Sequence, residues 1–171
     1  MIRVAIDAAW GVSCCAECVL SMPRSAVWGQ ARAFRRFITL DPFHQRVELS
    51  DPRPREGVAF RLIHGVGPFR LTRVGRILKW REGYGYAFSD LSTRGVQHGF
   101  PHIYEYELSD ADNGSCRVAI IVRGRWTARW IPRLVVRAWL CAVMRSARTA
   151  IRNELLSVRV AALKNASRHE E

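Results

Sequence analysis

The segment that decides the fold is IPRLVVRAWLCAVMRSARTAIRNELL, residues 131–156. Its hydrophobic side chains return at every fourth position, as they do along one face of an α-helix. These positions are Val135, Trp139, Val143, Ala147, Ile151 and Leu155, and the stripe is widened by Leu140 and Met144. The arginines lie mostly off the stripe, and Pro132 suits the first turn of a helix. The segment predicts one amphipathic helix of roughly 30 residues, whose apolar face must pack against another layer.

The region before this helix alternates between hydrophobic and polar residues, which is typical of half-buried β-strands. Clear examples are residues 58–64, 84–89, 102–108 and 117–123, and turn signals lie at 65–68, 82–83 and 110–114. No helical pattern separates these strands, so we expect an antiparallel sheet. A curved sheet with the long helix across its concave face would bury both apolar surfaces.

The N-terminal part of the chain indicates one strand and two short helices. Residues 14–22 suit the strand, which Pro23 ends, and the spacing of Val27, Ala31 and Phe34 is helical. A break near Ala33 divides the helices, and Asp41-Pro42 closes the segment. The predicted fold class is therefore α+β, with about seven strands, two short helices after the first strand and one long C-terminal helix.

Four segments in this order resemble the START-like, or SRPBCC, superfamily. They are MPRSAVW at residues 22–28, FITLDPFHQRVEL at 37–49, GRILKWREGYGYAFSDL at 75–91 and GRWTARWIPR at 124–133. The resemblance covers about residues 13–160 and implies a helix-grip fold. A single START-like domain is expected over residues 13–165, with residues 1–12 as an extension of uncertain structure and 166–171 as a frayed tail.

The resemblance also implies an internal cavity between sheet and helix. Members of the superfamily bind lipids, sterols, polyketides or plant hormones there, and some are polyketide cyclases or dehydrases. We therefore expect a carrier or sensor of a small hydrophobic or amphipathic molecule, with no cofactor. The alternative is a cyclase/dehydrase-type enzyme using the same cavity. A non-enzymatic role is favoured over an enzyme. The resemblance does not transfer a specific activity or ligand, because one fold supports many functions.

The stretch FPHIYEYEL, residues 100–108, supplies the central site candidates. His102, Tyr104, Tyr106 and Leu108 share one face of a strand, while Ile103, Glu105 and Glu107 share the other. Two inward glutamates would need buried partners, so the histidine and tyrosine face is expected to point into the cavity. Such side chains combine apolar area with a hydrogen-bonding tip, which suits a pocket for an amphipathic ligand.

His102 has three interpretations. The simplest is a polar wall residue; the second is a general acid or base, because the histidine pKa lies near ~6.5. The third is a metal ligand, but Gly99 and Pro101 prevent His98 and His102 from forming a helical two-histidine face. His44 and His64 could join them only through tertiary folding. No metal site is predicted, and His102 is the one catalytic candidate.

The same alternation on other strands and on the long helix gives the complete set of predicted ligand-binding residues. They are Phe60, Leu62, His64, Tyr86, Phe88, His102, Tyr104, Tyr106, Ile120, Val122, Trp139 and Val143. Asp90 falls on the same set as Tyr86 and Phe88 and is either an acidic partner or a strand-end residue.

Composition limits the other partners. The net charge is +12, carried almost wholly by arginines that are spread along the chain without a block of five or six. This spread argues against a nucleic-acid partner, while Arg129, Arg133 and Arg137 leave a peripheral membrane contact open. The oligomeric state is not indicated.

The cysteines and the N-terminus favour a cytoplasmic protein. Cys15 and Cys18 form a C-x-x-C without the second pair that a structural zinc requires, so reduced, buried thiols are expected. No apolar run reaches the ~18 residues of a membrane span. Asp7 and Glu17 interrupt the apolar stretch at the N-terminus, which argues against a signal peptide.

Overall fold

The computed structural model describes residues 1–66, 69–89 and 100–167. Across these residues the α+β fold is confirmed: one antiparallel sheet of eight strands is combined with two short helices and one long helix. The strands are β1 Ile2–Ile6, β2 Gly11–Leu20, β3 His44–Leu49, β4 Ala59–Val66, β5 Phe69–Arg81, β6 Gly85–Ser89, β7 His102–Ala111 and β8 Ser115–Arg125. The helices are α1 Arg24–Ala31, α2 Phe34–Ile38 and α3 Arg133–Ser167, and the 3-10 turn Asp112–Gly114 joins β7 to β8.

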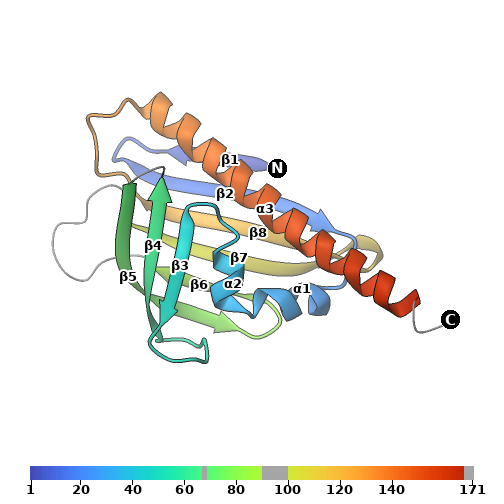
Figure 1. Cartoon of the computed structure of the whole chain (residues 1–171). Helices are drawn as coiled ribbons and strands as arrows, with labels where there is room; N and C mark the ends of the chain where they lie inside the picture. Colours follow the sequence, from blue (N-terminus) through green and yellow to red (C-terminus); the bar gives the residue numbers. More distant parts are fainter. Residues whose placement is uncertain (67–68, 90–99, 168–171) are drawn as a thin grey trace.

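The strand order is β1-β2-β8-β7-β6-β5-β4-β3, so β3 lies at the opposite edge of the sheet from β1. The chain crosses from β2 to β3 through α1 and α2, which therefore lie across the concave face (Figure 1). A break at Ala33 separates these two helices, as predicted. The predicted turn at residues 110–114 is also confirmed, with Asn113 in the left-handed region at φ 56°.

Strand β1 is the main addition to the predicted architecture. It pairs with β2 from Ile2–Ala16 to Ile6–Val12, within the segment that sequence analysis left as an extension of uncertain structure. The carboxylate of Asp7 closes the turn by accepting hydrogen bonds from the backbone N–H groups of Ala9, at 2.7 Å, and Gly11, at 2.8 Å. The alternation of Ile2, Val4 and Ile6 with Arg3 and Ala5 is a strand pattern that the sequence already contained.

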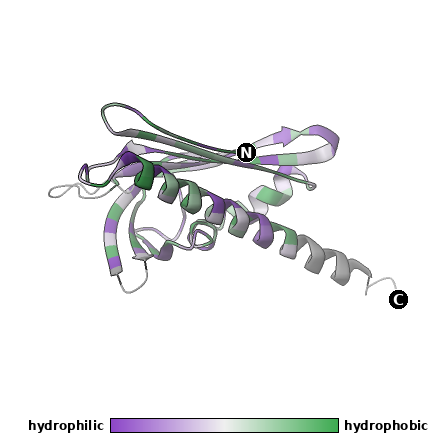
Figure 2. Cartoon of the chain, turned by 90° about the horizontal axis from the view of Figure 1, so that it is seen from above, coloured by the Kyte–Doolittle hydropathy of each residue, from purple (hydrophilic) through white to green (hydrophobic). Residues whose placement is uncertain are grey.

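The long helix is confirmed, but its buried face differs from the predicted stripe at the N-terminal end. The buried seam is Val136, Leu140, Met144, Ala147, Ile151 and Leu155. Val135 is 56% exposed and Trp139 is 39% exposed. A strict four-residue repeat drifts around a helix of 3.6 residues per turn, and the real seam corrects this drift with one spacing of three. Within the described residues, no helix is long and apolar enough to span a membrane. Figure 2 shows hydrophobic and hydrophilic residues mixed along α3.

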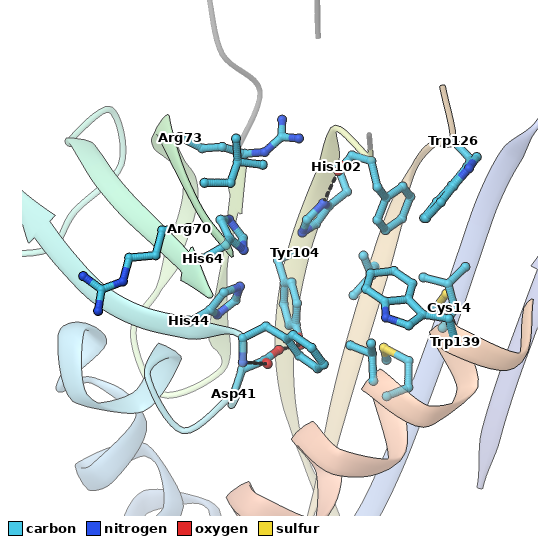
Figure 3. A pocket seen from close by; sticks show the side chains of 17 residues that line it. Cys14, Asp41, His44, His64, Arg70, Arg73, His102, Tyr104, Trp126 and Trp139 are labelled. Carbon is cyan, nitrogen blue, oxygen red and sulfur yellow. Dashed lines mark hydrogen bonds between the residues drawn. The ribbon is translucent and has the colours of Figure 1, made fainter. Parts of the chain in front are cut away.

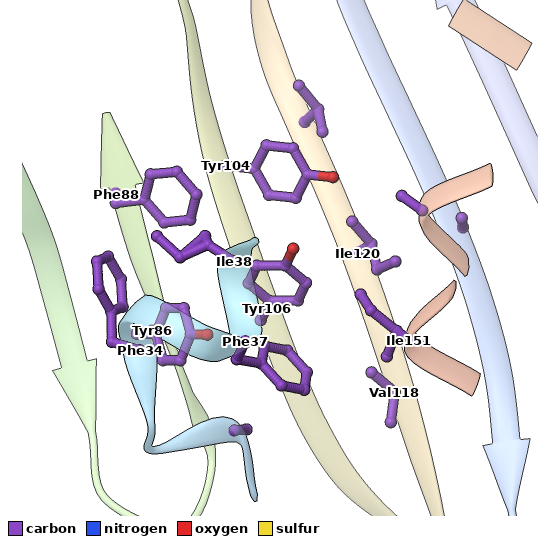
Figure 4. Packing of buried hydrophobic residues seen from close by; sticks show 14 of the residues in the cluster. Phe34, Phe37, Ile38, Tyr86, Phe88, Tyr104, Tyr106, Val118, Ile120 and Ile151 are labelled. Carbon is purple, nitrogen blue, oxygen red and sulfur yellow. The ribbon is translucent and has the colours of Figure 1, made fainter. Parts of the chain in front are cut away.

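One half of the concave face is filled by aromatic side chains of helix α2. Helix α2 inserts Phe34 and Phe37 into the sheet beside α1, and the Phe34 ring lies 5.1 Å from Tyr86 and 5.6 Å from Phe88. The Phe37 ring lies 5.1 Å from Tyr106 (Figure 4). Aromatic pairs of this geometry contribute about 0.5–1.5 kcal/mol each beyond burial. Side chains thus pack this half of the molecule into a continuous core.

Replacing Phe34 with Ala is expected to lower the free energy of unfolding by about 3–5 kcal/mol, because it removes a buried ring and leaves a cavity between α2 and the sheet. Urea denaturation followed by circular dichroism measures the loss. Leu78→Ala is the control, since Leu78 is an exposed residue of β5. Similar losses in the two variants would contradict the central role of the α2 contact.

Candidate functional site

A cavity of about 280 Å³ lies between the curved sheet and the N-terminal half of α3 (Figure 3). Its polar lining comes from the loop before β3 and from strands β3, β4, β5 and β7: Asp41, His44, His64, Arg73, His102 and Tyr104. Arg70 of β5 also lines the cavity, but its guanidinium points away from it (Figure 3). Its apolar lining comes mostly from β2, β8, α3 and the segments next to them: Cys14, Phe43, Leu71, Phe100, Val122, Trp126, Trp139, Leu140, Val143 and Met144. The hollow is therefore lined mainly by apolar surface, and its few polar side chains gather on one side.

Three histidines meet on the polar side. His44 and His64 are register partners on β3 and β4, and their ring centroids are 5.0 Å apart. His102 on β7 lies 6.4 Å from His64. The tertiary fold thus brings together three residues that are far apart in sequence. Across the described residues, however, no three His, Cys, Asp or Glu side chains are grouped so that they could hold a metal ion.

Backbone carbonyls fix the tautomers of two of these rings. His44 Nδ1 lies 3.0 Å from the Ile38 carbonyl oxygen, and His102 Nδ1 lies 2.7 Å from the Phe100 carbonyl oxygen. A carbonyl only accepts, so Nδ1 must carry a proton and donate it in each pair. In the neutral ring Nε2 then keeps its lone pair and can act as an acceptor or a base. The Phe100 ring also stacks on His102 with centroids 4.7 Å apart.

His64 is held uncharged. Burial lowers the pKa of its imidazole to about 2, and electrostatic interactions with His44, His102 and Arg73 act in the same direction. A buried arginine nearby adds to the effect of burial, because a second cation there would be repelled. At neutral pH His64 therefore contributes a polar, neutral surface to the cavity.

Asp41 and Tyr104 form the anchor of the polar side. The Tyr104 hydroxyl donates to Asp41 Oδ2 at 2.9 Å, and the backbone N–H of Phe43 donates to Asp41 Oδ1 at 3.0 Å. Burial, followed by the negative charge of Asp41, raises the pKa of Tyr104 well above its ordinary value, so the phenol keeps its proton. These bonds fix the loop that places Phe43 and His44 at the cavity.

Aromatic rings from α3, from the segment before it and from the loop before β3 meet on the apolar side. The Trp139 ring lies 5.6 Å from Trp126 and 6.1 Å from Phe43. The Trp126 indole N–H donates to the Ala128 carbonyl at 3.0 Å, which leaves its ring face for packing. Such rings offer a large apolar surface with few side-chain torsions to freeze when a ligand binds.

The cysteines do not form a reactive centre in the described part of the chain. All five are free thiols, and Cys15 and Cys18 point to opposite faces of β2 because they are three residues apart. Cys14 lines the cavity, but burial, with smaller effects from Cys141 and Cys15, raises the pKa of its thiol to about 12. A thiol with such a pKa is a weak nucleophile at neutral pH.

The structure divides the predicted ligand-binding residues into two equal groups. Six of them line the cavity: His64, His102, Tyr104, Val122, Trp139 and Val143. The other six lie in the packed core against α1 and α2 or deep in the sheet: Phe60, Leu62, Tyr86, Phe88, Tyr106 and Ile120. Asp90 and His98 lie outside the described residues.

Several cavity residues were not among the predicted positions. Asp41 was interpreted only as a helix terminator, and Arg70 and Arg73 lie on a strand whose inward face sequence analysis did not assign. Arg73 is buried, whereas the Arg70 guanidinium points away from the cavity (Figure 3). His44 was considered only as a residue that tertiary folding could bring to His102, and it reaches the cavity because its strand pairs with the strand of His64.

A pH-dependent stability is expected from His64. Below the ordinary histidine pKa of 6.5, the His64 imidazole of the unfolded chain binds a proton. In the folded chain the same imidazole stays neutral down to about pH 2. The unfolded state thus binds more protons in this window, and stability falls as the pH is lowered, by up to about 1.4 kcal/mol per pH unit.

His64→Gln, which cannot take up this proton, is expected to flatten the profile between pH 6.5 and pH 4. Urea denaturation across this range measures it. Tyr104→Phe is the control, because it removes a buried hydrogen bond but no group that titrates there. Parallel profiles for wild type and His64→Gln would contradict the assignment.

Solved structures with the same architecture are found by comparison. The crystal structure of Ara h 8.0201 matches with a TM-score of 0.62 and 15% identity, covering 86% of this chain and 99% of that one. The crystal structure of TTHA0849 from Thermus thermophilus matches with a TM-score of 0.64 and 15% identity, covering 85% of this chain and 98% of that one. No family model and no curated protein matches the sequence. Ara h 8 is Bet v 1-like, of the START/SRPBCC type, and at this identity the likeness shows that the chain shares the helix-grip fold.

Proposed function

We propose that the protein binds a small amphipathic molecule in the cavity and acts as its carrier or sensor. The observation that carries this proposal is the two-sided lining of one hollow. Histidine, tyrosine and arginine side chains lie on one side and a cluster of aromatic and aliphatic side chains on the other. Pockets that combine an apolar wall with a few convergent polar groups are typical small-molecule sites.

The lining also supports an orientation for the ligand. Its apolar part would contact Trp126, Trp139 and Met144, and its polar end would face His64 and His102. Because Nδ1 of His102 donates to a carbonyl, its Nε2 is suited to accept a hydrogen bond from a ligand hydroxyl or phenol. The volume of about 280 Å³ lies just below the usual range for ligand pockets, about 300–1,000 Å³. A compact ligand is thus favoured over a lipid with two long chains.

The comparisons support the proposal at the level of the fold. Bet v 1-like folds are hydrophobic ligand-binding folds in general. The likeness does not identify a ligand, because the same fold carries many functions.

The cavity-filling substitution Val143→Phe tests the proposal. Val143 lines the cavity from α3, and the larger ring should occupy the space of the ligand. Titration with the amphipathic dye anilinonaphthalene sulfonate is expected to show binding to wild type that weakens about tenfold or more in the variant. Native mass spectrometry of the purified protein is expected to show an added small-molecule mass that Val143→Phe loses.

Val19→Phe is the matched control, since Val19 is an exposed residue of β2, and thermal unfolding verifies that both variants fold. If Val143→Phe binds the dye as wild type does, the ligand does not occupy this cavity.

The position of His102 favours one second candidate, an enzyme of the cyclase/dehydrase type. The ring lines the cavity with Nδ1 held by a carbonyl, which prepares Nε2 to take a proton from a bound molecule.

His102→Gln separates the two candidates. A co-purified ligand is incubated with each protein and analysed by liquid chromatography and mass spectrometry. We expect that neither wild type nor the variant converts it. Conversion of the ligand by wild type and not by His102→Gln would instead assign catalysis.

A further inference from the structure

A second surface feature lies next to the cavity but outside it. Trp130 is 84% exposed and Leu134 is 79% exposed, and Val135 and Trp139 continue this hydrophobic surface along the first turns of α3. We call these four residues the α3 entry patch. Trp139 belongs to both features, because it lines the cavity as well. Trp139 therefore connects these exposed apolar side chains with the edge of the candidate ligand site.

The segment of sequence that contains the patch is strongly basic, although Arg117 and Arg123 at its start pair with Glu17 and Glu105. Between Asp112 and Glu154 there are nine arginines and no acidic residue, while the whole chain has a net charge of +12. The arginines are Arg117, Arg123, Arg125, Arg129, Arg133, Arg137, Arg145, Arg148 and Arg152. Arg129 and Arg137 are exposed beside the patch. The N-terminus of α3, which has no acidic residue in its first turn, adds the positive end of a helix dipole.

One arginine of this group has a structural role. Arg133 donates to the Ala8 carbonyl at 2.8 Å, and its guanidinium lies 4.9 Å from the centre of the Trp10 ring. It therefore ties the start of α3 to the β1–β2 turn and holds the patch in a fixed orientation. Arg129 and Arg137 are the better residues for testing an electrostatic contact.

We propose that the α3 entry patch docks on an anionic lipid bilayer. Tryptophan prefers the interface between headgroups and acyl chains, and exposed leucine and valine gain by leaving water there. Basic residues around such apolar side chains are attracted by anionic headgroups. A nucleic acid would use the arginines but would gain little from Leu134 and Val135, so the combination favours a bilayer. Docking in this way brings Trp139, and with it the cavity edge, to the membrane surface.

The test is co-sedimentation with phosphatidylcholine vesicles that contain or lack phosphatidylserine. Wild type is expected to bind the vesicles that contain phosphatidylserine and to bind the neutral ones at least tenfold more weakly. Trp130→Ser with Leu134→Ser should weaken binding about tenfold or more, because it removes the inserted apolar side chains. Arg129→Gln with Arg137→Gln should weaken it by a similar factor and reduce its sensitivity to salt.

Matched controls come from exposed residues of the opposite arm of the sheet. Val74→Ser with Leu78→Ser, and Arg61→Gln with Arg76→Gln, change exposed apolar residues and exposed arginines on β4 and β5 and should leave vesicle binding unchanged. Vesicle binding equal in wild type and the Trp130/Leu134 variant overturns the proposal. So does binding of short duplex DNA that is lost in the Arg129/Arg137 variant while vesicle binding stays constant. Val143→Phe should dock normally, so the outcome is independent of the proposed ligand binding.

Discussion

The contact between α3 and one edge of the sheet determines the rest of the structure. The seam from Val136 to Leu155 packs mainly against β1 and β2. Helices α1 and α2 cover another part of the sheet, where α2 contributes Phe34 and Phe37. Two separate helical elements thus cover different parts of one concave face. The space that neither fills is the cavity, bounded by Trp139 and Met144 of α3. Its existence follows from this division of the face (Figures 1 and 3).

The polar side of the cavity is organised before any ligand arrives. Asp41 is held by the Tyr104 hydroxyl and a backbone N–H, and the Nδ1 atoms of His44 and His102 donate to backbone carbonyls. Buried polar groups that are fixed by internal hydrogen bonds lose little further freedom on binding, which lowers the entropic cost of recognition. The neutral His64 between them avoids a second buried cation beside Arg73.

Alternation along the strands predicted which face a side chain occupies, and it placed His102, Tyr104 and Tyr106 correctly on the buried side. It could not show how far along the strand the cavity ends. Tyr104 meets the cavity, whereas Tyr106, two residues on, packs against Phe37. Whether a side chain meets the cavity or the core depends on the part of the sheet that α2 covers, which is a feature of the tertiary structure. Asp41 was missed for the same reason, because a loop residue shows no periodicity.

The most direct test of this account is a crystal structure of the protein with a bound amphipathic molecule, beginning with whatever co-purifies. The account predicts ligand density between His102 and Trp139, with a polar ligand atom about 2.6–3.2 Å from an imidazole nitrogen of the cavity. A structure in which α3 has closed onto β3 and β4 so that Trp139 fills the space, or in which the molecule binds outside the hollow, would contradict it.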